Sequence, residues 1–141
     1  MKKNIMVMCT GNSFRSHMAQ AFIEKYAENR AVVYSSGVKA SGKVYPWAIK
    51  LMDEVGIDIS KNLSENIDKY FDIDFDFLIT VCDNARETCP IFPKPVGLKI
   101  HHSFKDYEPQ GDLSDEEYLN TLRPIRDAID IFCRDFVKEN L

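Results

Sequence analysis

The sequence predicts a single α/β domain, in which helices form a sandwich around a mostly parallel sheet. The chain has 141 residues, which suits one compact domain spanning 1–141. Four short runs rich in apolar residues, at 4–8, 31–35, 75–81 and 96–100, have the composition of buried parallel strands. Helical patterns separate the first three runs and follow the fourth, and this alternation is typical of a parallel sheet.

Two helices are expected in the first half of the chain. The first covers 16–29, where apolar residues recur at helical spacing. Ser16 can cap it, because a serine hydroxyl can accept a hydrogen bond from an amide in the first turn. The second helix begins at Pro46, since proline suits the first helical position, and it is stopped by Gly56.

The second half of the chain has less regular patterns. Ser64 is expected to cap a short amphipathic helix over 67–71. The segment 82–93, which contains cysteine and proline, is expected to be irregular. From Ser114 to the end the pattern is helical, and Pro124 is expected to divide a short helix from a longer final one, because an interior proline breaks the hydrogen-bond ladder.

Composition and charge exclude several classes of protein. The formal net charge is −4 with acidic and basic residues interspersed, so we expect no nucleic-acid surface. No apolar stretch is long enough for a signal peptide or a membrane span, so we expect a cytoplasmic protein without a membrane anchor. Four cysteines in such a chain are expected to be catalytic or buried thiols rather than a disulfide framework.

The stretch that follows the first predicted strand has the features of an oxyanion site. Cys9 ends the apolar run, and Arg15 follows in a C-x5-R spacing just before the first helix. Gly11 and Asn12 allow a tight turn whose amides, with the helix N-terminus, stabilise a thiolate and a bound anion. Arg15 can bind two oxygens at once, and Ser16 can donate its hydroxyl to the thiolate. The predicted anion-binding residues are Thr10, Gly11, Asn12, Ser13, Phe14, Arg15 and Ser16.

A second pair of cysteines, Cys82 and Cys89, lies seven positions apart and is followed by Pro90. In one continuous helix this spacing would separate them by about 10.5 Å, too far for a disulfide, so they can bond only where the segment bends. Two unrelated thiols are the alternative. Cys9 and Cys82 each follow a predicted strand, so we expect them at the same edge of the sheet.

The sequence resembles the low-molecular-weight protein tyrosine phosphatase fold family in the anion loop and in residues 18–21, 34–37 and 56–60, so the resemblance covers nearly the whole chain. The family implies a three-layer sandwich with a four-stranded parallel sheet. The positions of Cys9, Cys82 and Cys89 are similar to those of the thioredoxin-coupled arsenate reductases of this fold. This resemblance implies that Cys9 attacks arsenate and that electrons then pass to a Cys82–Cys89 disulfide, which a thioredoxin-type reductant resets.

The resemblance also implies an acidic residue after the fourth strand and leaves its identity open. Asp106 is favoured as the acid, and Glu108, next to Pro109, is the competing alignment. Phe14 stands where many members carry a second cysteine, which leaves Cys82 to resolve an oxidised Cys9.

Some members bind a potassium ion beside the anion loop. Asn12 and Ser35 are present at matching places, but Gln20 and Glu65 replace the usual acids here. We therefore expect no metal site and no bound cofactor. The expected function is arsenate detoxification with residual phosphatase activity. The alternatives are a tyrosine phosphatase and a non-enzymatic thiol redox sensor.

Overall fold

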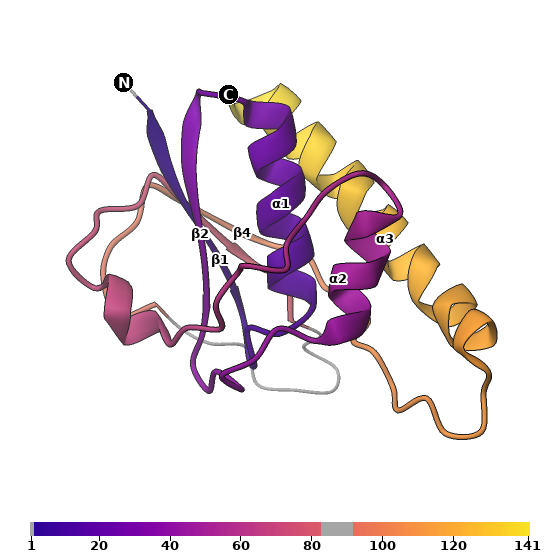
Figure 1. Ribbon diagram of the computed structural model, residues 1–141. Coiled ribbons are helices and arrows are strands. Elements are labelled where there is room, and N and C mark those ends of the chain that lie inside the picture. The colour runs from indigo at the N-terminus through magenta and orange to yellow at the C-terminus, as the bar shows by residue number, and fades with distance from the viewer. Residues whose placement is uncertain (1, 83–91) are drawn as a thin grey trace.

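The computed structural model describes residues 2–82 and 92–141, and its elements follow the predicted alternation of strands and helices (Figure 1). In chain order they are β1 (Lys3–Cys9), α1 (Arg15–Ala27), β2 (Ala31–Gly37), α2 (Pro46–Asp53), the 3₁₀ helix η1 (Ile67–Tyr70), β3 (Phe77–Thr80), β4 (Leu98–His101) and α3 (Asp115–Asn140). Each of the four predicted strands is therefore present, with shifted ends.

The four strands form one parallel sheet in the order β2-β1-β3-β4, which confirms the predicted fold class. β1 lies in the middle, and Ile5 through Met8 are fully buried because both faces of the sheet are covered. The register pairs Met8 with Ser36 of β2 and with Thr80 of β3. The carboxyl ends of these three strands therefore meet at one edge of the sheet, where Cys9 ends β1.

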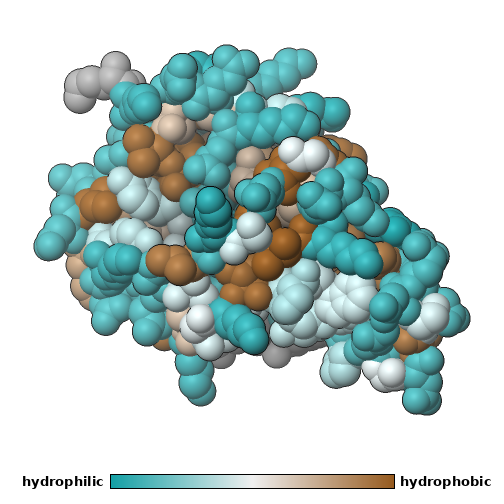
Figure 2. Space-filling model, in the orientation of Figure 1, coloured by the Kyte–Doolittle hydropathy of each residue, from teal (hydrophilic) through white to brown (hydrophobic). Residues whose placement is uncertain are grey.

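Helices α1 and α3 cover one face of the sheet, and α2 packs beside them (Figure 1). Residues of α1, α2 and α3 and one face of β1 form the larger core cluster. The opposite face is covered by a smaller cluster that includes Ile67 of η1 and Phe92. The surface drawn in Figure 2 is mostly hydrophilic, with hydrophobic side chains gathered near its middle, between α1 and α2. Within the described residues, no helix has both the length and the apolar character needed to cross a membrane.

The predicted break at Pro124 is wrong, because α3 continues through it as one helix of 26 residues. Leu122 and Ile125 lie on either side of the proline, and both are buried in the larger core. An interior proline costs about 3 kcal/mol. Burial of a continuous apolar stripe on both sides of Pro124 outweighs that cost. The predicted start at Ser114 is confirmed, since Ser114 and Glu117 form a reciprocal capping box.

The predicted cap at Ser64 is also wrong. Asn66 occupies the N-cap of η1, and no side chain caps that helix. The Ser64 hydroxyl instead accepts a hydrogen bond from the Gly42 amide and donates one to the Gly11 carbonyl. It therefore ties two loops together, because it lies too far before the helix to reach its first amides.

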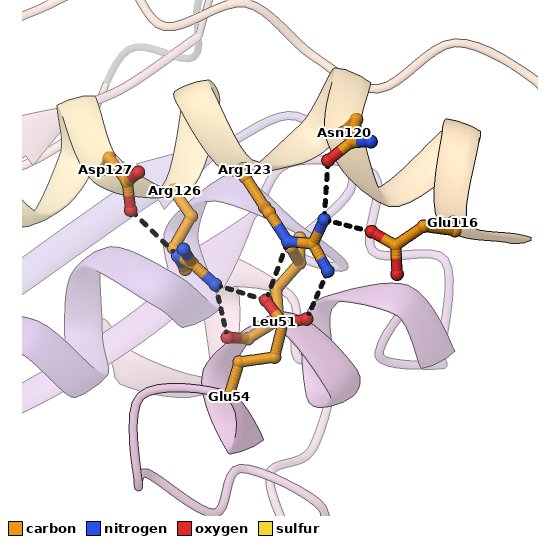
Figure 3. A network of polar contacts seen from close by, with 7 residues as sticks. All are labelled: Leu51, Glu54, Glu116, Asn120, Arg123, Arg126 and Asp127. Atoms are coloured by element: carbon orange, nitrogen blue, oxygen red, sulfur yellow. Dashed lines mark hydrogen bonds and ion pairs between the residues drawn. The ribbon is translucent and has the colours of Figure 1, made fainter.

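A polar network joins the C-terminal end of α2 to α3 (Figure 3). Arg126, which is buried, donates hydrogen bonds to the Leu51 carbonyl and to Glu54 Oε1 at 3.0 and 2.6 Å. Arg123 donates to both oxygens of Glu54, from Nε to Oε1 at 3.2 Å and from Nη2 to Oε2 at 2.7 Å, and it also contacts Glu116. Two arginines of α3 thus share one carboxylate of the α2 terminus and fix the position of that helix.

We expect Glu54→Gln to lower the free energy of unfolding at pH 7 by about 1 kcal/mol. Hydrogen bonds from Arg123 and Arg126 hold the pKa of Glu54 at about 2, below its ordinary 4.5. The stabilisation is therefore complete above about pH 4.5 and lost as the pH falls toward 2. In urea denaturation, the difference in the free energy of unfolding between Glu54→Gln and the wild type should be smaller at pH 3 than at pH 7. Glu139→Gln, at an exposed position near the end of α3, is the control; a difference that stays constant with pH would contradict the prediction.

Candidate active site

Cys9 lies at the carboxyl end of β1, only 2% exposed, at the floor of the loop that leads into α1. Its thiol donates to Ser16 Oγ at 3.0 Å, and the Asn12 amide donates to Cys9 Sγ at 3.2 Å. If the thiol loses its proton, the Ser16 hydroxyl can turn and donate to the sulfur. The loop therefore offers two donors to a thiolate at this position.

Asn12 gives the loop its tight turn. Its φ of 46° lies in the left-handed region, which asparagine tolerates better than most residues. The side chain is fully buried and satisfied: Oδ1 accepts from the Glu65 amide at 2.7 Å, and Nδ2 donates to Ser16 Oγ at 2.9 Å. Asn12 thus connects the sulfur, the start of α1 and the segment before η1.

The carbonyl groups of the loop are bonded to groups outside it. Those of Thr10, Gly11 and Ser13 accept hydrogen bonds from the amides of Lys39, Ser41 and Tyr45, at 3.1, 2.9 and 2.8 Å. The Asn12 carbonyl accepts one from the ring of His17 at 3.0 Å. With the carbonyls held in this way, the loop can turn amides toward an anion, the arrangement of a phosphate-binding nest.

Gly37, at the end of β2, passes directly behind this loop. A Cβ on Gly37 would stand 2.4 Å from the Thr10 carbonyl oxygen and 3.1 Å from the Asn12 nitrogen. Both are backbone atoms, so they cannot swing away as a flexible side chain would. Only glycine fits here without moving the anion loop.

We therefore expect Gly37→Ala to weaken anion binding strongly while leaving most of the fold intact. A displacement of the loop by about 1 Å would cost on the order of 10²-fold in turnover. The measurement is the dissociation constant of phosphate by isothermal titration calorimetry, together with kcat/KM. Gly97→Ala is the control, because its Cβ would stand equally close to a backbone oxygen, 2.4 Å from that of Asp76, but at the end of the sheet away from the anion loop. Wild-type phosphate affinity in Gly37→Ala would refute the steric argument.

The interpretation of Ser16 as a helix cap is wrong. Helix α1 begins at Arg15, Phe14 occupies its N-cap, and no side chain caps it. Ser16 is buried inside the first turn, where its hydroxyl lies between Cys9 and Asn12. The helix starts one residue earlier than predicted because the bonds of the anion loop fix its entry.

Arg15 reaches from the first turn of α1 to the loop after β4. It is only 2% exposed; Nη1 donates to the Phe104 carbonyl at 3.2 Å, and Nη2 pairs with Asp106 Oδ2 at 3.3 Å. Cys9, Arg15 and Asp106 together line a cavity of about 280 Å³. The guanidinium is therefore held at the wall of the cavity by a neutral and an anionic acceptor.

The structure brings one of the two candidate acids to this cavity. Asp106 lines it beside Cys9 and Arg15, with a side chain that is 43% exposed. Glu108 is absent from its described lining and lines a neighbouring cavity under the same loop. Its carbonyl accepts a hydrogen bond from Tyr118, which holds the loop against α3.

An aromatic cluster lies at the Cys9 cavity, which Phe14 and Tyr107 line. Tyr45 and Tyr107 stack with ring centroids 3.8 Å apart, and Phe14 packs edge-on against both. The Tyr45 hydroxyl bonds to that of Tyr118 at 2.7 Å, and burial raises the pKa of Tyr45 above its ordinary value. Tyr107 is adjacent to the predicted acid Asp106, whereas Tyr45 lies far from the acid loop in the sequence and no sequence signal pointed to it.

Cys82 is fully buried and disulfide-bonded, whereas Cys9 and Cys133 are free thiols. Cys82 follows β3, and the Val81 amide bonds to the Met8 carbonyl, so Cys9 and Cys82 leave neighbouring strands at the same edge. Cys89, most of the segment predicted as irregular and any contact made there lie outside the described residues.

Three of the positions compared above with a potassium site, Gln20, Ser35 and Glu65, form hydrogen bonds or an ion pair with neighbouring protein groups. Ser35 donates to Gln20 Oε1 at 2.7 Å, and Gln20 donates to the Val33 carbonyl. Lys69 pairs with Glu65 at 2.7 Å. A neutral amide and a lysine ammonium are poor neighbours for a bound cation. Within residues 2–82 and 92–141, no three His, Cys, Asp or Glu side chains are grouped for a metal.

Known proteins are similar to this chain in sequence and in fold. A model of the low molecular weight phosphotyrosine protein phosphatase family covers residues 4–140. An arsenate reductase of Halalkalibacterium halodurans is 40% identical over 91% of this chain and 90% of that protein. Arsenate reductase 1 of Staphylococcus epidermidis is 42% identical over 93% and 96%. A solved arsenate reductase in the phosphate-binding state superposes with a TM-score of 0.78 at 28% identity, over 97% of this chain and 98% of that one.

Proposed function

The chain belongs to the low molecular weight phosphotyrosine protein phosphatase family, and we propose that within it the chain is an arsenate reductase. One observation carries the proposal: a free Cys9 at the floor of an anion cavity ends the strand next to the one that leads to the disulfide-bonded Cys82. A phosphatase needs only the first of these features.

The first step is nucleophilic attack. The Cys9 thiolate attacks the arsenic atom of an arsenate held by the loop amides and by Arg15. An As–O bond breaks, and Asp106 protonates the departing oxygen, which leaves as water. The product is a covalent Cys9–arsenate adduct in which arsenic is still pentavalent.

The second step is reduction. Cys82 thiolate attacks Cys9 Sγ, an S–S bond forms, and the S–As electron pair stays on arsenic, which leaves as trivalent arsenite. Cys89 then attacks Cys82, which frees Cys9 and leaves a Cys82–Cys89 disulfide. An external thioredoxin-type dithiol reduces that disulfide. The free Cys9 and bonded Cys82 of the structure fit the state after the last exchange. Because the relay needs a compartment that maintains reduced dithiols, we place it in the cytoplasm.

The relay is tested by arsenate-dependent NADPH oxidation with thioredoxin and thioredoxin reductase. Cys82→Ser and Cys89→Ser should each lose repeated turnover but keep hydrolysing an aryl phosphate, because the anion cavity is unchanged. Cys133→Ala is the matched control: this cysteine is buried against the Ala19 carbonyl, and turnover should be retained. Repeated arsenate turnover by both serine variants would refute the relay.

The assignment of the acid is a separate prediction. Asp106→Asn should lower the rate of aryl phosphate hydrolysis by about 10²–10⁴-fold, because the amide cannot protonate the leaving oxygen. Glu108→Gln should stay close to wild type, since that side chain is not in the described lining of the Cys9 cavity. Single-turnover kinetics at saturating substrate distinguish the two. The reverse pattern would assign the role to Glu108.

A further inference from the structure

One carbonyl of the anion loop is held differently from its neighbours. Backbone amides hold the carbonyls of Thr10, Gly11 and Ser13, and nearly any residue supplies a backbone amide. The Asn12 carbonyl instead depends on the imidazole of His17, at 3.0 Å. The identity of residue 17 therefore matters to the loop in a way that the identities of residues 39, 41 and 45 do not.

The contacts of His17 determine where its ring carries a proton. A carbonyl oxygen only accepts, so Nε2 must donate to Asn12. In a neutral ring Nδ1 is then an acceptor, and Asn62 Nδ2 lies 3.2 Å from it as a donor. His17 is 1% exposed, and burial lowers the pKa of its ring. Burial therefore favours the neutral ring, which is also the form that both contacts require. Asn62 itself is half-buried.

We propose that Asn62 and His17 are positioning residues of the anion loop: Asn62 fixes the Nε2–H tautomer of His17, which holds the Asn12 carbonyl away from the pocket. Asn12 is in the left-handed region, and its amide donates to Cys9 Sγ. Rotation of the peptide units around Asn12 would turn a carbonyl toward the bound anion. The pair thus keeps the pocket lined by donors.

This proposal concerns the pocket of the proposed arsenate reductase, and it is tested without arsenate. The first readout is the protonation of the His17 ring, observed by long-range ¹H–¹⁵N NMR of histidine-labelled protein and assigned with His17→Gln. We expect a protonated Nε2 and an unprotonated Nδ1 in the wild type. In Asn62→Asp the carboxylate only accepts, so both nitrogens of His17 should be protonated at pH 7. A wild-type ring protonated at Nδ1 would overturn the proposal.

The second readout is the dissociation constant of inorganic phosphate, by calorimetry. His17→Leu should weaken binding by about tenfold, the effect of one lost hydrogen bond. His17→Gln should stay within about threefold, since its amide can donate to the Asn12 carbonyl from a similar reach. Asn62→Ala, at a half-buried position, should weaken binding severalfold and broaden or duplicate the His17 signals. Amide NMR spectra and urea midpoints check that each variant is folded. If His17→Leu unfolds, the phosphate affinity of Asn62→Ala and the tautomer of the wild-type ring test the positioning role instead.

Wild-type phosphate affinity in folded His17→Leu, or an unchanged His17 tautomer and affinity in Asn62→Ala, would overturn the positioning role. If the wild type binds phosphate with the expected tautomer but never reduces arsenate, the proposed function fails and the positioning role stands.

Discussion

Cys9→Ser is expected to abolish arsenate reduction and to lower aryl phosphate hydrolysis by at least about 10⁴-fold. A serine hydroxyl remains protonated near neutral pH and is a weak nucleophile. It also cannot form the disulfide whose formation leaves two electrons on arsenic. Arsenate reduction should therefore be lost completely, whereas slow hydrolysis of the aryl phosphate by a water molecule at the anion site can remain.

The fold should tolerate this change, which makes the result interpretable. Cys9 Sγ contacts the Ser16 hydroxyl and the Asn12 amide, and a serine oxygen can make both contacts. We expect an unchanged thermal midpoint and retained phosphate binding, measured by calorimetry. Cys133→Ser is a useful contrast: that thiol is buried in the core, where burial raises its pKa, and its loss should affect stability rather than turnover. Residual arsenate turnover by Cys9→Ser would exclude it as the nucleophile.

Much of the site could be predicted because its chemistry is local in the sequence. The apolar run to Cys9, the left-handed Asn12 and the arginine at the start of a helix lie within seven residues of one another. Strand, turn and helix signals there agree with one another, so the placement of each group follows from its neighbours. Ser16 shows the limit: it contacts the sulfur as predicted, but the helix begins one residue earlier than predicted and Ser16 does not cap it.

The residues that support the loop could not be predicted, because they reach it only in the folded chain. Gly37, Tyr45 and Asn62 come from separate segments, and no local pattern connects them with Cys9. His17 is adjacent in sequence, but its hydrogen bond to the Asn12 carbonyl depends on the backbone turn. The strand order β2-β1-β3-β4 is likewise a tertiary property.

The uninterrupted α3 shows the same limit for a whole element. Pro124 is a local signal for a break, and the expectation based on it was wrong. Packing on α1 and α2, including the Arg126 contact with Leu51, depends on residues far away in the sequence. Tertiary burial outweighed the local penalty.

Arg15→Lys is expected to reduce kcat/KM for arsenate and the affinity for phosphate by about 10²–10³-fold each, the usual cost of removing one aligned donor to a developing oxyanion. The guanidinium donates to the Phe104 carbonyl and to Asp106 with its two terminal nitrogens, and Arg15 lines the cavity. A lysine ammonium is a point charge on a flexible stem and cannot reproduce that fork. The lysine keeps the positive charge but loses the planar arrangement of donors, so the variant tests whether charge alone is enough to bind the anion.

The control for this variant is Arg134→Lys, at an exposed position on α3 where the arginine pairs only with its neighbour Asp135 among the described residues. It should retain wild-type kinetics. Arg15→Lys should also release the acid loop, because the Phe104 carbonyl and Asp106 both lose their contact with α1. Faster amide hydrogen exchange across 104–108 would report that release. Wild-type phosphate affinity in Arg15→Lys would mean that the loop amides alone bind the anion, and the arginine would then be a tether for the acid loop.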